Sequence, residues 1–193
     1  MKKLNLILIF VIGLMFVACK DNKDDEPKAP SKSGILGLWY EGEDSEEEGI
    51  YDLLITNEVW LWNPRVTTLV PYKNSSYKEL AERFAPDDEF LIYRYDSSNN
   101  VYLLYESTSE DWDNPNAKIV FQAKQITVAQ IKVSDDVMDI TMYYYVNNPN
   151  FENVDYEDAL FSYEEIMSNP QFGTLANGVQ LGKPEFITYK RYK

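Results

Sequence analysis

Residues 89–105 read EFLIYRYDSSNNVYLLY and carry the clearest hairpin signal in the chain. Two runs rich in aromatic and apolar residues, 89–95 and 101–105, flank the turn-forming residues 96–100. Such runs separated by Asp, Ser and Asn predict two antiparallel strands joined by a turn. A second hairpin is expected from 126–133 and 137–146, and further strands are expected at 34–40, 51–55, 59–62, 65–70, 119–123 and 185–192.

Two short helices are expected among these strands. Ser76-Tyr77-Lys78-Glu79 is a capping box that opens a helix over 76–84, and residues 156–167 mix apolar and acidic residues as a second helix does. About eight to ten antiparallel strands must close a barrel or pair two sheets to avoid exposed edges. We therefore predict a mainly β domain over 34–193, an antiparallel meander that closes into a β-barrel, with a β-sandwich as the alternative.

The N-terminus has the pattern of a secretory signal. Residues 1–3 give a basic start, residues 4–17 are almost wholly apolar, and a small residue precedes Cys19, the chain's only cysteine. The apolar run is shorter than the roughly 20 residues that span a bilayer as a helix. Phe16-Val17-Ala18-Cys19 resembles the lipobox of bacterial lipoproteins, which are cut just before a lipidated cysteine. The resemblance implies a signal peptide over 1–18 and a membrane anchor on Cys19; a buried cysteine in an apolar helix is the alternative.

Residues 19–33 are interpreted as a disordered tether between the lipidated cysteine and the domain, because residues 20–33 are charged, hold two prolines and lack apolar periodicity. The start of this segment, residues 20–26, resembles the acidic export tags of surface-exposed lipoproteins in some Gram-negative bacteria. Lys20 follows the cysteine, so the inner-membrane retention signal is missing. The resemblance implies an outer-membrane location, either surface-exposed or facing the periplasm.

The composition excludes several function classes. The chain of 193 residues has a formal net charge of −14, no His and one Cys. An acidic surface repels the phosphate backbone and excludes nucleic acid as a partner. Without His, and with Cys19 lipidated, Cys–His and Ser–His–Asp catalysis and nitrogen or sulfur zinc sites are excluded. No carboxylate pair stands out, and the oxygen-rich loop 111–116 departs from an EF-hand, so we predict no enzyme, no cofactor and no metal site.

Gly37-Leu38-Trp39 lies in the first expected strand, and the last expected strand is basic. This Gly-x-Trp, followed by a meander, resembles the first strand of the lipocalin-like lipoproteins of bacterial envelopes. In that family a basic side chain from late in the chain covers the indole, and the resemblance gives this role to Arg191 over Trp39. It implies an up-and-down β-barrel that holds a small apolar ligand in a cavity.

Six aromatic residues are the candidate ligand-binding residues, because they stand in pairs at i, i+2 spacing and each pair is expected to share a strand face. Facing inward, they pack a core or line a cavity for a small apolar molecule. Facing outward, they form a stacking platform for a glycan or a protein, as in a surface interaction module. A structural envelope lipoprotein without a ligand is the third alternative. The six are Trp60, Trp62, Tyr93, Tyr95, Tyr143 and Tyr145.

Overall fold

The computed structural model describes residues 32–41, 52–63, 69–85, 90–109, 114 and 116–192. The expected signal peptide and Cys19 lie outside these residues, as does most of the loop 111–116. The expected tether lies outside them too, apart from Lys32 and Ser33, which begin the short helix α2 (Lys32–Ile35).

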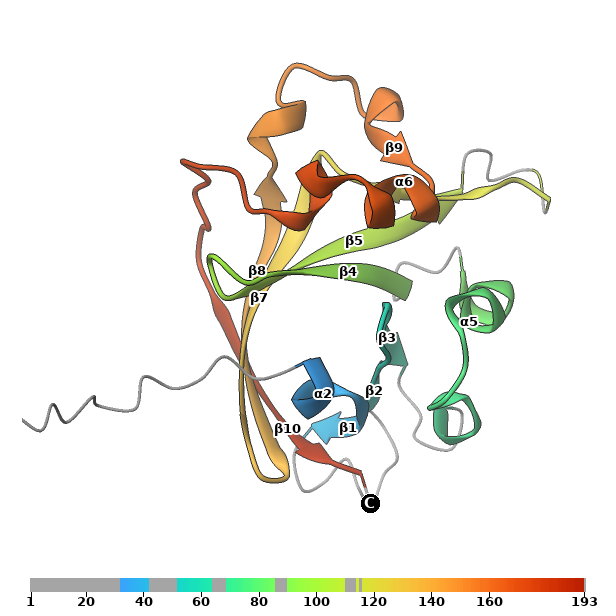
Figure 1. Cartoon of the computed structure of the whole chain (residues 1–193), viewed down its shortest axis with the longest axis vertical. Helices are drawn as coiled ribbons and strands as arrows, with labels where there is room; N and C mark the ends of the chain where they lie inside the picture. The colour runs from blue at the N-terminus through green and yellow to red at the C-terminus, as the bar shows by residue number, and fades with distance from the viewer. Residues whose placement is uncertain are drawn as a thin grey trace, which may run out of the picture.

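Eight antiparallel strands close into a barrel, which confirms the predicted mainly β fold and favours the barrel over the sandwich. Each of these eight strands pairs with the barrel strand before it and the barrel strand after it, and the last pairs with the first, so the barrel is an up-and-down meander (Figure 1). Closure pairs every strand of the barrel on both sides. The eight strands are β1 (Gly37–Glu41), β2 (Asp52–Ile55), β3 (Val59–Asn63), β4 (Phe90–Asp96), β5 (Val101–Ser109), β7 (Gln125–Ser134), β8 (Val137–Asn147) and β10 (Glu185–Arg191).

Two further strands extend the sheet outside the barrel. The first part of β5 pairs with β7, whereas its last residues, 107–109, pair with β6 (Ile119–Gln122). Strand β6 in turn pairs with the two-residue strand β9 (Leu160–Phe161). The chain thus leaves the barrel wall after β5 and returns to it at β7.

The two predicted short helices are present, with one shifted in position. Helix α5 (Tyr77–Phe84) begins at the predicted capping box of Ser76 and Glu79. Helix α6 (Tyr163–Ser168) begins later than expected, because residues 156–162 form a 3₁₀ turn, strand β9 and a second capping box at Ser162. Of the strand expected at 65–70, the described part is helical instead. The 3₁₀ turns are η1 (Val70–Tyr72), η2 (Pro149–Phe151), η3 (Glu157–Ala159) and η4 (Pro170–Gly173).

The strands of the central hairpin are buried on both faces. Outward-facing residues such as Phe90 and Ile92 belong to an outer cluster that also contains Leu80 of α5 and Ile166 of α6. Their neighbours along the chain face the barrel interior instead. Because α5 and α6 cover the outer wall (Figure 1), β4 and β5 read as nearly continuous apolar runs.

Candidate functional site

The candidate site is the barrel interior. Alternate residues of every barrel strand contribute to one apolar set, which we call the inner cluster. Aromatic residues and methionines are prominent in it, and every member is nearly or fully buried. The inner cluster consists of Ile35, Trp39, Leu53, Ile55, Trp60, Leu91, Tyr93, Tyr102, Leu104, Ala129, Ile131, Met138, Ile140, Met142 and Tyr189.

A row of aromatic rings crosses the inner face of β3, β4 and β5. The rings of Trp60 and Trp62 meet edge-on, with centroids 5.6 Å apart. Trp60 meets Tyr93 at 6.4 Å, and Tyr93 meets Tyr102 at 5.7 Å. Tyr95 closes the row against Tyr102 at 4.8 Å. These separations are those of favourable aromatic pairs, so the row forms one continuous contact surface inside the barrel.

Two polar atoms in this row have no hydrogen-bond partner among the described residues: Trp60 Nε1 and Tyr102 Oη. Both side chains are almost completely buried, at 0% and 1% exposure. Burial, with a further contribution from Tyr95, raises the pKa of Tyr102 to about 12, so its hydroxyl stays protonated and can donate. A buried donor without a partner costs about 1–3 kcal/mol, so each of these atoms calls for an explanation.

Their aromatic neighbours are satisfied by the protein itself. The Tyr93 hydroxyl donates to the Thr56 carbonyl over 2.7 Å. The Trp62 indole N–H donates to the Tyr189 hydroxyl over 3.2 Å. The lack of partners is therefore specific to Trp60 and Tyr102 and is not a general property of the aromatic row.

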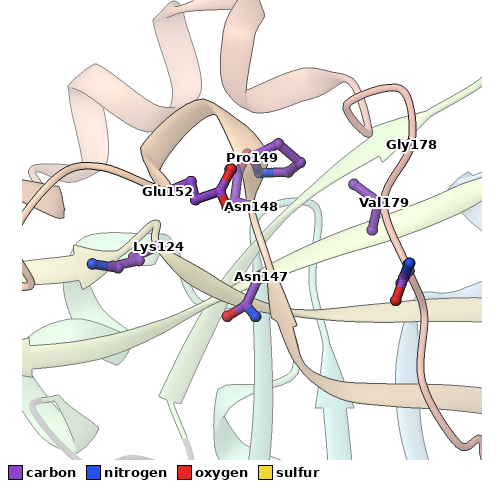
Figure 2. A pocket seen from close by; sticks show the side chains of 8 residues that line it. Lys124, Asn147, Asn148, Pro149, Glu152, Gly178 and Val179 are labelled. Atoms are coloured by element: carbon purple, nitrogen blue, oxygen red, sulfur yellow. The ribbon is translucent and has the colours of Figure 1, made fainter.

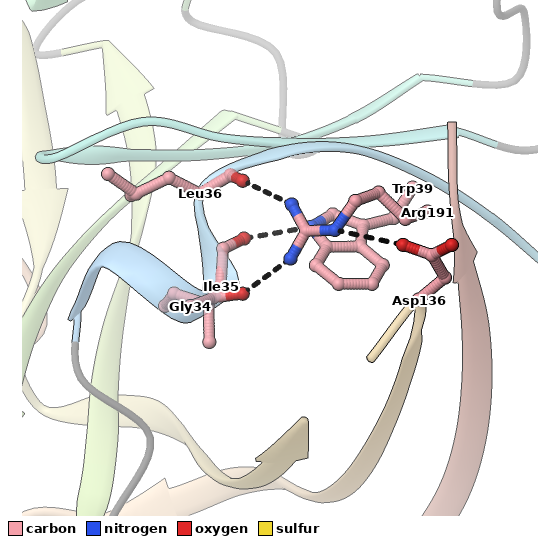
Figure 3. Close-up of polar contacts among 6 residues, drawn as sticks. All are labelled: Gly34, Ile35, Leu36, Trp39, Asp136 and Arg191. Atoms are coloured by element: carbon pink, nitrogen blue, oxygen red, sulfur yellow. Dashed lines mark hydrogen bonds and ion pairs between the residues drawn. The ribbon is translucent and has the colours of Figure 1, made fainter. Parts of the chain in front are cut away.

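Arg191 and the chain before β1 close one end of the barrel, where Ile35 belongs to the inner cluster. Figure 3 shows the contacts that Arg191 makes with this segment. The Arg191 guanidinium carbon lies 4.1 Å from the centre of the Trp39 ring, which is the contact that the resemblance implied. Its Nη1 donates to the Leu36 carbonyl over 2.9 Å, and its Nη2 donates to the Gly34 carbonyl over 2.7 Å. An ion pair with Asp136 at 3.9 Å completes the arrangement.

Gly37 is required by the same arrangement. Its φ is +128°, a conformation that residues with a Cβ rarely adopt, and a Cβ built there would lie 3.4 Å from Arg191 Nη1. The Trp39 indole N–H donates to the Ile35 carbonyl over 2.8 Å. Gly37, Trp39 and Arg191 thus come together as one structural unit at the closed end.

Acidic groups stand at the end of the barrel away from α2. Strand register directs Glu41, Glu106 and Glu185 toward the inner side there. Burial raises the pKa of the Tyr144 hydroxyl, and the charges of Glu185, Glu41 and Glu106 raise it further, so all three carboxylates lie near this ring. The half-buried Trp62 also packs on the inner cluster. This end therefore combines aromatic surface with negative potential.

The structure separates the six predicted aromatic residues. Trp60 and Tyr93 belong to the inner cluster, and Trp62 and Tyr95 pack against it. The third pair does not share a face, which corrects the expected alternation: Tyr143 packs on the outer cluster, whereas Tyr145 is 71% exposed. The reason is a β-bulge, since the pairing of β7 with β8 shifts register between Ile126 and Val128.

Sequence reasoning missed Tyr102 and Tyr144. Tyr102 follows the turn of the central hairpin and pairs directly with Tyr95, so hairpin register was a usable signal. Tyr144 lies between two predicted residues, and i, i+2 alternation from Met142 would have placed it on the inner face.

Two pockets lie away from the unpartnered donors. One, of about 410 Å³, is mostly polar and is lined by residues of the β7–β8 end and of the loop before β10 (Figure 2). The other, of about 550 Å³, lies beside Leu36 and Gly37 and reaches the loop before α5. Neither pocket is lined by Trp60 or Tyr102. The first is lined by Lys124, Asn147, Asn148, Pro149, Glu152, Gly178, Val179 and Gln180.

The described residues contain no group of three or more His, Cys, Asp or Glu that could hold a metal ion. Nor does that part of the chain contain a helix long and apolar enough to cross a membrane. No protein-family model matches the chain, and neither a curated protein nor a solved structure matches it. Fold and site define a closed eight-stranded antiparallel barrel with an aromatic interior.

Proposed function

We propose that this chain is an exported, lipid-anchored binding protein that holds a small apolar molecule in its barrel. The fold is compatible with a ligand-binding barrel. The anchor is argued from the resemblance of Phe16-Val17-Ala18-Cys19 to a lipobox. The proposal includes no catalytic step, cofactor or nucleic acid.

The observation that carries the proposal is the pair of unpartnered donors in an aromatic row. Trp60 Nε1 and Tyr102 Oη are buried in the inner cluster without an acceptor among the described residues. An interior used only for packing is more stable with apolar groups of the same shape at such positions. A bound molecule supplies both apolar contact to the rings and an acceptor for the donors.

Titration of the purified protein with an environment-sensitive apolar dye tests this proposal. We expect saturable dye fluorescence together with a change in tryptophan emission, because Trp60 and Trp62 lie in the aromatic row. Trp62→Ala should weaken dye binding, whereas the exposed Tyr145→Ala should not. Absence of saturable binding would overturn the proposal of an internal ligand.

A surface interaction module is the second candidate, and one observation favours it. Phe186 of β10 and Tyr145 of β8 are 77% and 71% exposed, which is unusual for large aromatic side chains. Stacking on a sugar ring or on a protein partner would use such side chains. A Tyr145→Ser, Phe186→Ser double variant that loses glycan or protein binding, with dye binding unchanged, would favour this candidate.

The anchor and the location are tested separately from ligand binding. Cys19→Ala should abolish incorporation of a labelled fatty acid and release the protein from the membrane fraction. Protease treatment of intact cells distinguishes surface exposure from a periplasmic orientation. If the wild-type protein incorporates no labelled fatty acid, the lipid anchor is excluded, and the proposal of a ligand in the barrel still stands.

A further inference from the structure

The chemistry of the two unpartnered atoms restricts what can satisfy them. An indole N–H is a donor only, and a tyrosine hydroxyl next to apolar rings is best satisfied by donating. Both Trp60 Nε1 and Tyr102 Oη therefore require an acceptor. They flank Tyr93 in the aromatic row, and neither donor is open to solvent or lines a described pocket. An acceptor therefore reaches them only when the surrounding side chains move apart.

The charges around the interior restrict the ligand further. Among the described residues, no Lys or Arg is buried. The guanidinium of Arg191 is already committed to two carbonyls and the Trp39 ring at the closed end. At the other end, Glu41, Glu106 and Glu185 have inward register. A ligand carboxylate would lose its hydration without gaining a cation and would pass these acids on entry, so an anion is disfavoured.

Together, these observations define a class of ligand for the proposed function. We propose that the barrel selects a neutral apolar molecule that carries a hydrogen-bond acceptor, such as a ketone, ester or amide carbonyl, for Trp60 and Tyr102. This inference rests on the proposed function and adds to it the polarity and charge of the bound molecule. It excludes free fatty-acid anions and pure hydrocarbons as the preferred ligands.

Three probes of equal chain length test the inference in the purified protein: methyl decanoate, decanoate and decane, each displacing the bound dye. We expect the ester to displace the dye at a concentration at least about tenfold lower than decanoate does. Decane should be about ten- to a hundredfold weaker than the ester, which corresponds to two neutral hydrogen bonds of about 0.5–1.5 kcal/mol each.

Matched variants identify the donors. Tyr102→Phe and Trp60→Phe should each weaken the binding of methyl decanoate about three- to tenfold relative to the binding of decane. The control variant Tyr145→Phe removes the hydroxyl of a tyrosine that is 71% exposed and lies outside the inner cluster, so the ester-to-decane ratio should stay unchanged. Ratios within one variant are insensitive to a general loss of packing or stability.

The outcomes separate the inference from the proposed function. If the dye itself does not bind saturably, the proposed function fails and the inference fails with it. If the dye binds and decanoate matches or exceeds the ester, the inference is overturned while the proposed function survives. The same holds if Tyr102→Phe and Trp60→Phe leave the ester-to-decane ratio unchanged, because the two donors then do not contact the ligand.

Discussion

Arg191 and Trp39 are direct cross-strand partners of β10 and β1, and the guanidinium of Arg191 stacks on the Trp39 ring. Strands β1 and β10 are the first and last strands of the barrel, so this contact lies on the seam at which the meander closes. The same guanidinium also binds the carbonyls that precede β1. One side chain thus connects the two ends of the fold.

Arg191→Met should lower the free energy of unfolding by about 2–4 kcal/mol. The variant keeps an apolar side chain of similar length but loses a cation–π contact and two charge-assisted hydrogen bonds. Urea denaturation followed by tryptophan fluorescence measures the effect. The exposed Lys183→Met is the control and should change stability by less than about 0.5 kcal/mol. Equal effects of the two variants would show that Arg191 does not stabilise the seam.

Gly173→Ala should destabilise the protein by about 1–3 kcal/mol through a clash with Arg94. An added Cβ would lie 2.5 Å from Arg94 Nη2. The guanidinium has little freedom to move away, because its Nη1 donates to the carbonyls of Ile166, Met167 and Asn169 at the end of α6.

A double-mutant cycle with Arg94→Met tests this cause. In the Arg94→Met background the Gly173→Ala substitution should cost clearly less, because the clashing group is gone. Thermal or urea denaturation of the four proteins gives the coupling. Additive effects would mean that the two residues act independently.

Asp96 should make the protein sensitive to acid. Burial by itself raises the pKa of this carboxyl, but hydrogen bonds from Asn99, Leu175 and Ser98 outweigh burial, so the net shift of the pKa is downward. A carboxyl with a lowered pKa in the folded state stabilises the fold above its ordinary pKa, near 3.8, and this contribution is lost as the pH falls through the folded-state value.

Asp96→Asn tests the acid sensitivity. At pH 7 the variant should be less stable than the wild type by about 1–3 kcal/mol. The difference in unfolding free energy between the two proteins should shrink below about pH 4. There the Asp96 carboxylate takes up a proton first in the unfolded chain and then, at lower pH, in the folded protein. Urea denaturation at pH 7, 5, 4 and 3 measures it. A difference that stays constant over this range would contradict the assignment.

Tyr145→Gly should leave stability unchanged or raise it by up to about 1 kcal/mol. Tyr145 has φ +53°, a left-handed conformation that favours glycine, and its exposed side chain makes little packing contact. Tyr143→Gly, two residues earlier and packed on the outer cluster, should destabilise the protein instead. Thermal denaturation compares them. A marked loss of stability in Tyr145→Gly would show that the bulge depends on the tyrosine ring.

Much of the fold could be predicted because its determinants are local. The hairpin predicted from 89–105 corresponds to β4 and β5, and the capping box at Ser76 opens α5. Strand propensity, turn residues and helix caps act over a few residues, so the sequence displays them directly. The helix expected over 156–167 was placed incorrectly in its first part, because pairing of β9 with β6 overrides the local helical pattern.

The candidate site was predictable only in part. Trp60, Trp62, Tyr93 and Tyr95 lie on the inner side, as regular alternation along β3 and β4 requires. Alternation failed for Tyr143 and Tyr145, because the bulge inserts one residue into β8 relative to β7. Whether a buried donor finds an acceptor depends on which strands become neighbours, and no local pattern carries that information.

The sequence by itself determined the strand-rich composition, the order of the hairpins, the acidic charge and the absence of histidine. It also contained the pattern at Gly37 and Trp39 from which a partner late in the chain was expected. Only the tertiary structure decided that the sheet closes on itself and that Trp60 Nε1 and Tyr102 Oη find no hydrogen-bond partner among the described residues. The physical reason is that local propensities depend on neighbours along the chain, whereas closure, register and hydrogen-bond satisfaction depend on strands that meet only after folding.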